Sequence, residues 1–297
     1  MYQKFSIKDN YENTRFDKWF KLEVLNLPQS LLQKILRKKK IKVNKKKIKA
    51  NYRLQLNDCV EIFDISHFSK REVKDRIKYK PQKKELKQFN DLILENNENF
   101  MVLNKPSGIA VQGGTKSFKN IIDILAKSEY FRLSKPFVVH RIDKETSGIL
   151  IVAKNRKYAQ LFTSLFRIRK IHKTYLAISH GEIPKTIKKL EDNLINYDNK
   201  KKIVQKATTY VKVIKTSKNF TLLELNPVTG RKHQIRKQLL NIGHPIVGDK
   251  KYFNKKERDK ELFLHAYKIK FMINEKKYNY KAEYNNKFMN FINSKFR

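Results

Sequence analysis

One nine-residue stretch decides how the chain is interpreted: His140-Arg141-Ile142-Asp143-Lys144-Glu145-Thr146-Ser147-Gly148. Apolar runs at 137–139 and 149–152 flank it, so we expect a loop held between two short strands. A loop anchored in this way can present a side chain to a cleft. The residues leave two alternatives open. Asp143 either belongs to a functional site, or it only hydrogen-bonds a hairpin turn in which Gly148 supplies a positive φ angle.

A His-Arg-x-Asp sequence also occurs in the catalytic loop of protein kinases. There an Asn follows the Asp by five residues, a Gly-rich loop precedes it and Asp-Phe-Gly follows it. The fifth residue after Asp143 is Gly148, and the chain contains neither of the other two motifs. The kinase interpretation is therefore rejected.

Short apolar runs and helical spacing continue on both sides of this loop. Strands are predicted at 100–103, 137–139, 149–152, 175–178, 209–214 and 220–225, and helices at 121–126, 159–166 and 233–240. The pattern predicts a mixed α+β domain over 91–290 with a largely antiparallel sheet. The stretch 182–202 is charged and has no period, so we expect an insertion loop there.

The beginning of the chain predicts a separate small domain over 14–63. Apolar residues recur at helical spacing in 15–27, Pro28 ends that helix, and a second helix begins at Gln29. Apolar residues at 41 and 43, at 54 and 56, and at 60 and 62 alternate as in short strands. The polar segment 64–90 predicts a charged linker.

The basic residues point to a polyanionic partner. Lys and Arg number 68 against 28 Asp and Glu, a net charge of +40, although 54 of the 68 are Lys and compositional drift is one explanation. Nine of the thirteen residues at 37–49 are basic and none is acidic. A solvated charged face is the alternative to a nucleic-acid surface. The expected RNA-binding residues here are Arg37, Lys38, Lys39, Lys40, Lys45, Lys46 and Lys47.

Several classes of protein are excluded. Cys59 is the only cysteine, which excludes an internal disulfide and a multi-thiolate zinc site. The chain has no apolar run near the ~18 residues of a membrane span, and residues 1–9 lack the apolar core of a signal peptide. A cytoplasmic location is expected. His140, His233 and His265 lack metal-ligand spacing, so no metal site is expected.

The loop at 140–148 resembles the H-R-L-D-x-x-T-S-G signature of RluA-type RNA pseudouridine synthases and departs from it only at Ile142. Five further motifs resemble those of the family and occur in the family's order, one before this loop and four after it: N-K-P-S-G at 104–108, K-T-Y at 173–175, T-G-R-K-H-Q-I-R at 229–236, G-H-P-I-V-G-D at 243–249 and L-H-A at 264–266. The segment 14–63 resembles an S4 RNA-binding domain, through R-F-D-K-W at 15–19, its basic second helix and V-N at 43–44.

The resemblance implies isomerisation of specific uridines in 23S (large-subunit) ribosomal RNA, by base flipping and without cofactor. It makes Asp143 the essential carboxylate, Arg236 its guanidinium partner and Tyr175 the aromatic stacked on the target base. Arg141 would fill the gap left by the extruded nucleotide or hold its phosphate, and Arg231 would bind phosphate. From the residues alone, Tyr175 could equally be a sheet aromatic and Arg236 a solvated helix residue.

The expected partner is ribosomal RNA or a large-subunit assembly intermediate, bound by a monomer. A noncatalytic RNA-binding protein and the same chemistry on transfer RNA are the alternatives. The first helix favours the RluC-like branch over the RluD-like one. Lys45 stands where a turn glycine is usual, and Lys232, Lys237 and Gln238 also depart from the family pattern, which bears on substrate choice.

Overall fold

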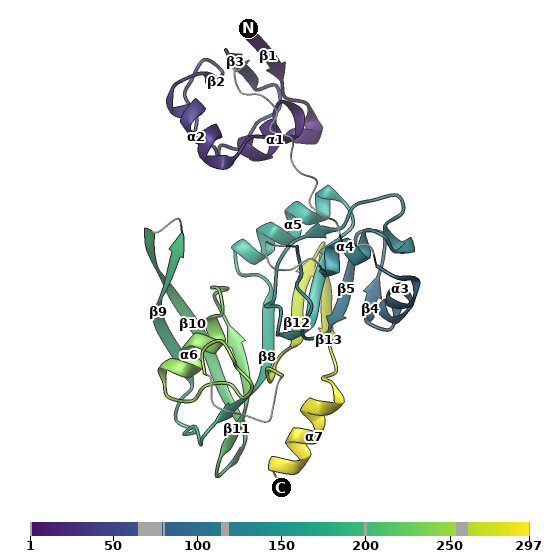
Figure 1. Ribbon diagram of the computed structural model, residues 1–297, viewed down its shortest axis with the longest axis vertical. Coiled ribbons are helices and arrows are strands. Elements are labelled where there is room, and N and C mark those ends of the chain that lie inside the picture. Colours follow the sequence, from purple (N-terminus) through teal and green to yellow (C-terminus); the bar gives the residue numbers. More distant parts are fainter. Residues whose placement is uncertain are drawn as a thin grey trace. The chain divides into compact units, whose positions relative to one another are not determined.

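The computed structural model describes residues 2–64, 79, 81–113, 119–198, 201–253 and 261–296. The chain divides into two compact units, Met1–Ile77 and Lys78–Arg297, and each is described by itself (Figure 1). Most of the expected linker, residues 65–78 and 80, lies outside the described residues. In the described ranges, no helix has both the length and the apolar character needed to cross a membrane.

The N-terminal unit is a three-stranded antiparallel sheet, in the order β1-β3-β2, packed against two helices. Its elements are β1 (Tyr2–Ser6), the 3-10 turn η1 (Asp9–Tyr11), α1 (Phe16–Glu23), α2 (Gln29–Arg37), β2 (Ile41–Val43) and β3 (Cys59–Phe63). The expected strand at Leu54 and Leu56 is wrong. Leu54 is fully buried in irregular chain, so its apolar character reflects burial and not strand alternation. Strand β1 precedes the expected start at 14.

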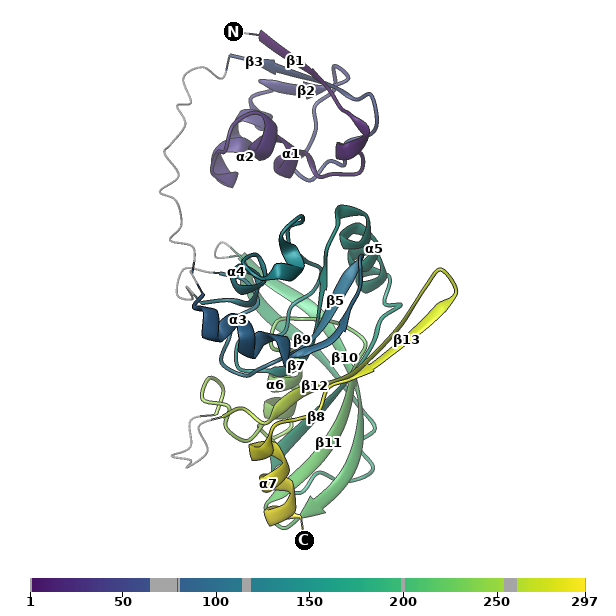
Figure 2. The same ribbon diagram turned by 90° about the vertical axis from the view of Figure 1, so that its right-hand side faces the viewer.

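The second unit is built on a ten-stranded sheet in the order β4-β5-β7-β12-β8-β11-β10-β9, with β13 on β12 and β6 on β7. Its strands are β4 (Ile93–Asn96), β5 (Phe100–Lys105), β6 (Phe137–Val138), β7 (Ser147–Ala153), β8 (His172–His180), β9 (Lys189–Asp198), β10 (Lys201–Ser217), β11 (Phe220–Pro227), β12 (Leu264–Ile273) and β13 (Lys276–Lys281). Figure 2 shows β12 and β13 as a long hairpin. Among these strands only β7 and β12 pair in parallel, which confirms a mixed, largely antiparallel sheet.

Helical segments complete the second unit. They are α3 (Lys83–Asn90), α4 (Ile121–Leu125), the 3-10 turn η2 (Glu129–Phe131), α5 (Arg156–Arg167), α6 (Gln234–Asn241) and α7 (Asn286–Lys295). Side chains of Asn120, Asn155 and Asn285 cap α4, α5 and α7. Helix α3 occupies the last part of the expected linker, and its buried Phe89 joins the core of the second unit.

The expected insertion loop at 182–202 contains β9, which pairs with β10 from Lys189 onward. Leu190 and Leu194 face inward from β9 and are buried. Asp192 lies on the same face between them and accepts hydrogen bonds from Gln238 (3.0 Å) and Asn241 (2.9 Å) of α6. Because an acid occupies one inward position, the apolar alternation of this strand is hidden in the sequence.

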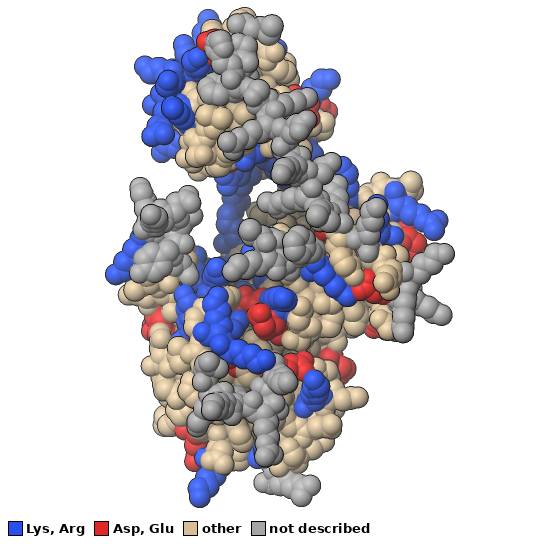
Figure 3. All heavy atoms as spheres, in the orientation of Figure 1, with Lys and Arg blue, Asp and Glu red and all other residues tan. Residues whose placement is uncertain are grey.

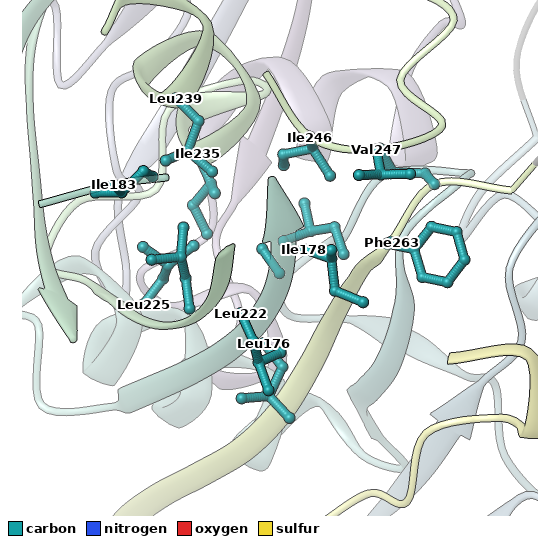
Figure 4. Close-up of a cluster of buried hydrophobic side chains, with 14 of the residues drawn as sticks. Leu176, Ile178, Ile183, Leu222, Leu225, Ile235, Leu239, Ile246, Val247 and Phe263 are labelled. Carbon is teal, nitrogen blue, oxygen red and sulfur yellow. The ribbon is translucent and has the colours of Figure 1, made fainter. Parts of the chain in front are cut away.

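Helix α6 is fixed on the sheet by its apolar face. Figure 4 shows Ile235 and Leu239 pointing from α6 towards the sheet, with Leu225 of β11 near Ile235. All three side chains are buried. The packing determines which face of α6 lies against the sheet, and therefore also where the neighbouring residue Arg236 can point.

Candidate active site

The loop that carries Asp143 connects β6 to β7, which pair antiparallel, so it is also a hairpin connection. Gly148 has φ +104° and pairs with Ala266 of the parallel strand β12, where a Cβ atom would lie 2.3 Å from the Ala266 carbonyl oxygen. Only glycine allows this approach. The expected hairpin and its positive-φ glycine are therefore present, and they fix the chain on which Asp143 lies.

A fully buried lysine braces this loop from the β5 end. The Nζ of Lys105 donates to the carbonyl oxygens of Pro106 (2.8 Å), Ile109 (2.9 Å) and Lys144 (3.2 Å), the last adjoining Asp143. Burial lowers the pKa of Lys105 to about 7, against the opposing charges of Glu145 and Asp143. The lysine ties two family motifs, distant in sequence, to one another.

The Asp143 carboxylate lies in a largely dry position, with 22% of its side chain exposed. Its Oδ2 is 3.7 Å from Nη1 of Arg236, and its Oδ1 is 3.5 Å from Nε2 of His233. Burial raises the pKa of Asp143 and the charge of Glu145 adds to this, while Arg236 and Arg141 oppose it. The pKa of Asp143 is raised overall because burial outweighs the two cations.

The closest partner of Arg236 is Asp249. Nε of Arg236 donates to Oδ2 at 2.7 Å and Nη2 donates to Oδ1 at 2.6 Å, and both side chains are buried. Nη1 has no hydrogen-bond partner among the described residues and lies 3.5 Å from Glu145 and 3.7 Å from Asp143. Arg236 therefore faces the cleft and not solvent, but it reaches Asp143 only by a long contact.

The loop before α6 includes His233, the residue at which the helix was expected to begin. Helix α6 begins at Gln234, and His233 precedes it in the left-handed conformation, with φ +53°. Gln234 accepts from the Thr229 hydroxyl (2.6 Å) and from the Arg231 amide (3.1 Å), and its own amide donates to Thr208 (3.1 Å). These bonds hold the loop to β10, so Arg231 is carried by a rigid turn.

Tyr175 lies on β8, half-buried, beside the Asp143 loop. Burial raises the pKa of its phenol above the ordinary value, and the charge of Asp143 raises it further. The phenol therefore stays protonated at neutral pH. Lys173 lies two residues earlier on the same strand, and burial lowers its pKa to about 8.

These residues line one cleft of about 590 Å³, inside the range of about 300–1,000 Å³ typical of ligand sites. It brings together Asp143, Tyr175 and Arg236, with Arg141 and Arg231 also in its lining. Arg141 is exposed, and Arg231 is half-buried and donates from Nε to the Lys206 carbonyl at 3.2 Å. Arg167 and Arg169, at the end of α5, also line the cleft, and no sequence pattern had singled them out.

The three histidines have hydrogen-bond partners in the fold. Nε2 of His140 accepts the Ile151 amide at 2.8 Å, and His265 bonds Ser147 and Ala282, each at 2.9 Å. The described ranges hold no group of three His, Cys, Asp or Glu residues able to bind a metal ion.

His233 and Tyr252 form a second layer around Asp143 that sequence patterns did not indicate. Burial lowers the pKa of His233 to about 3, so it is neutral. The Tyr252 hydroxyl lies 2.6 Å from Nδ1 of His233. When this hydroxyl donates to Nδ1, the proton of the neutral ring is on Nε2 and points at Asp143. The Tyr252 ring also lies 5.2 Å from the guanidinium of Arg236.

Two of the residues that depart from the family pattern, Gln238 and Lys45, have structural features that the sequence does not reveal. Gln238 is fully buried, accepts from Thr209 at 2.6 Å and donates to the Leu190 carbonyl at 3.2 Å, so it joins α6 to β9 and β10. It does not reach the cleft lining. Lys45 adopts φ +63°, the backbone region for which glycine is preferred.

The N-terminal unit has a basic face at α2, β2 and the turn that follows (Figure 3). Arg37, Lys38, Lys39, Lys45, Lys46 and Lys47 are exposed there. Lys40 differs from these, because its Nζ lies 3.0 Å from an Asp64 carboxylate oxygen and is ion-paired within the unit.

Comparison with known proteins identifies the class. Residues 99–241 match the RNA pseudouridylate synthase family. The ribosomal large subunit pseudouridine synthase C of Buchnera aphidicola subsp. Schizaphis graminum is 34% identical over 97% of this chain and 96% of its own length. The protein of the same name from Vibrio vulnificus is 32% identical over 91% of this chain and 88% of its own.

A solved structure agrees with these sequence relatives. Human RNA Pseudouridylate Synthase Domain Containing 4 superposes with a TM-score of 0.59 at 26% identity, over 70% of this chain and 94% of that one. The chain belongs to the RluA-type RNA pseudouridylate synthase family and is a pseudouridine synthase, an isomerase.

Proposed function

We propose that this chain isomerises specific uridines of large-subunit ribosomal RNA to pseudouridine, as an enzyme of the RluC-like branch. The observation that carries the proposal is the single cleft in which Asp143, Tyr175 and Arg236 meet. The names of the relatives that match nearly the whole chain support the choice of RNA.

The reaction breaks the N1–C1′ bond, rotates the uracil and forms a C5–C1′ bond. N1 gains a proton and C5 loses one, so no net electrons are transferred. Ionised Asp143 acts on the sugar, either by attack at C1′ or by removal of a sugar proton. Nη1 of Arg236, 3.7 Å away, is placed to stabilise that carboxylate, and its position is held by Asp249.

The remaining site residues serve base flipping. Extruding a uridine costs a few kcal/mol in lost stacking and pairing. Tyr175 keeps its proton and offers its ring to the extruded base, which supports stacking and hydrogen-bond donation as its roles. Exposed Arg141, on the other side of Ile142 from Asp143, is suited to occupy the vacated position or hold the phosphate.

The N-terminal unit acts, in this proposal, as an S4-like RNA-binding domain within residues 14–63. Its exposed lysines would contact phosphates without reading sequence. The enzyme works as a cytoplasmic monomer, on ribosomal RNA or on an assembly intermediate of the large subunit.

The test maps pseudouridines in ribosomal and transfer RNA from cells with and without this gene. The proposal expects individual large-subunit sites to disappear with the gene and to return with the wild-type copy. Loss of transfer-RNA sites alone would support the transfer-RNA alternative. An unchanged map, combined with retained RNA binding, would support a noncatalytic RNA-binding protein.

A further inference from the structure

Lys173 is a cation in the cleft for which the described part of the chain supplies no carboxylate partner. The residue is half-buried on β8, and burial is the cause that lowers its pKa. Asp143, the acid in the cleft lining, lies instead beside Arg236. A cation withdrawn from water without a counter-ion is costly unless a ligand supplies the opposite charge.

The strand places Lys173 next to the chemistry. Residues two apart on a strand share a face, so Lys173 and Tyr175 both face the cleft, as its lining shows. Nζ of Lys173 lies 4.0 Å from the point that a Cβ on Gly230 would occupy. The ammonium group thus lies beside the turn that carries Arg231, and its strand presents Tyr175 to the same cleft.

The neighbouring residues His140 and Gly230 do not neutralise the charge of Lys173. His140 lies close enough for the charge of Lys173 to add to burial in lowering the pKa of His140, to about 3. An imidazole is either neutral or positively charged, so His140 cannot serve as a counter-ion. Gly230 has no side chain that could fill the space in front of the ammonium group.

We propose that Lys173 binds a backbone phosphate flanking the extruded uridine and so forms an anion subsite at the wall of the cleft, with Arg231 nearby. The inference rests on the proposed function, because it takes RNA as the substrate. A phosphodiester is the anion that every nucleotide brings, and an ammonium group binds it as a point charge. The subsite would hold the nucleotide while its base lies against Tyr175.

The experiment uses the full-length protein and an RNA fragment that it modifies. A neutral methylphosphonate replaces, one at a time, each of the two phosphates flanking the target uridine. Affinity and single-turnover rate are measured for the wild type, Lys173→Met, Lys173→Arg and a control, Lys218→Met. Lys218 lies in the turn between β10 and β11, at the opposite end of β8, and its substitution removes the same charge away from the cleft.

Lys173→Met is expected to weaken binding of the ordinary RNA at least tenfold, Lys173→Arg to recover part of that affinity, and Lys218→Met to stay within twofold. One methylphosphonate should weaken the wild type to a similar extent and add nothing to Lys173→Met. Removal of an unpaired, half-buried charge should leave the melting temperature equal or higher, which separates weaker binding from impaired folding.

Two results would overturn the subsite. The first is a Lys173→Met variant that binds RNA as tightly as the wild type. The second is a loss of affinity from Lys173→Met that multiplies with the loss from the methylphosphonate at both positions, which would show that the lysine contacts the base or the sugar. A wild type that forms no pseudouridine in any large-subunit RNA fragment would instead contradict the proposed function, so the two failures are distinguishable.

Discussion

Arg236 and Asp249 form a buried bidentate ion pair, with donor–acceptor distances of 2.7 and 2.6 Å. Asp249 also accepts the amides of Lys251 (3.1 Å) and Tyr252 (3.2 Å), so its carboxylate is fixed by backbone. The pair uses two of the three guanidinium nitrogens and leaves Nη1 facing Asp143, with no hydrogen-bond partner in the part of the chain that the structure describes. A buried donor of this kind is costly unless it serves a substrate or an intermediate.

Asp249→Asn tests this arrangement. The amide keeps the shape of the carboxylate but loses its charge, so Arg236 is no longer held rigidly. We expect a loss of about 10- to 100-fold in single-turnover rate at saturating RNA, or about 1.4–2.7 kcal/mol of transition-state stabilisation, with little change in affinity. The control is Asp192→Asn, which also removes an acid bonded to α6 but lies on β9. Equal rates for Asp249→Asn and Asp192→Asn would show that Asp249 is not part of the catalytic machinery.

The pH dependence of the rate follows from the raised pKa of Asp143. The reaction needs the carboxylate, so the single-turnover rate should fall, as pH is lowered, at a higher pH than the ordinary carboxyl value of 3.8. His233 is neutral above its pKa of about 3 and does not contribute to this limb. A rate that stays constant down to pH 3.8 would show that burial does not control this group.

Gly148→Ala, compared with a control, distinguishes two reasons for glycine at the start of β7, which are the positive φ angle and the lack of space for a Cβ atom. A Cβ there would meet the Ala266 carbonyl oxygen at 2.3 Å, in addition to the cost of φ +104°. Gly243→Ala is the matched control, because Gly243 has φ +80° and open space around its Cβ position. We expect Gly243→Ala to cost about 1–2 kcal/mol in unfolding free energy and Gly148→Ala clearly more. Chemical denaturation measures both, and equal costs would argue against the close approach of β7 and β12.

The basic face of the N-terminal unit should act through counterion release. Replacing Lys45, Lys46 and Lys47 by Gln should reduce the slope of log affinity against log salt by roughly 0.7–0.9 for each phosphate that is no longer neutralised. Lys40→Gln is the control, because Lys40 is already ion-paired with Asp64 and should change the slope less. An unchanged slope in the triple variant would assign these lysines to compositional drift.

Sequence patterns correctly predicted those elements of the fold in which the apolar residues follow a simple pattern. The apolar runs of β5, β7, β8 and β11 lie in the sheet as expected, because uninterrupted burial leaves a readable signal. Strand β9 was missed, since Asp192 occupies an inward position and is satisfied by α6. Such compensation depends on a partner distant in sequence, which no local pattern contains.

The same distinction applies to the site. Asp143 stood out because its whole loop matches a family signature, whereas Asp249 lies in a quoted motif with nothing local to indicate its partner, thirteen residues away. His233 was interpreted as structural, and only the structure places its Nε2 at 3.5 Å from Asp143. An acid directly after the apolar run 245–248, in a chain so poor in acids, was the available signal for Asp249.

The central claim is that ionised Asp143 carries out the isomerisation, and tritium release from RNA containing 5-tritiated uridine tests it most directly. Forming the C5–C1′ bond displaces the C5 hydrogen, so each turnover releases tritium to water. Asp143→Asn should bind RNA and release none, and it should be at least as stable as the wild type at pH 7. The stability follows because a carboxyl with a raised folded-state pKa destabilises the fold once it is ionised. A variant that retains a tenth of the wild-type rate would contradict the claim.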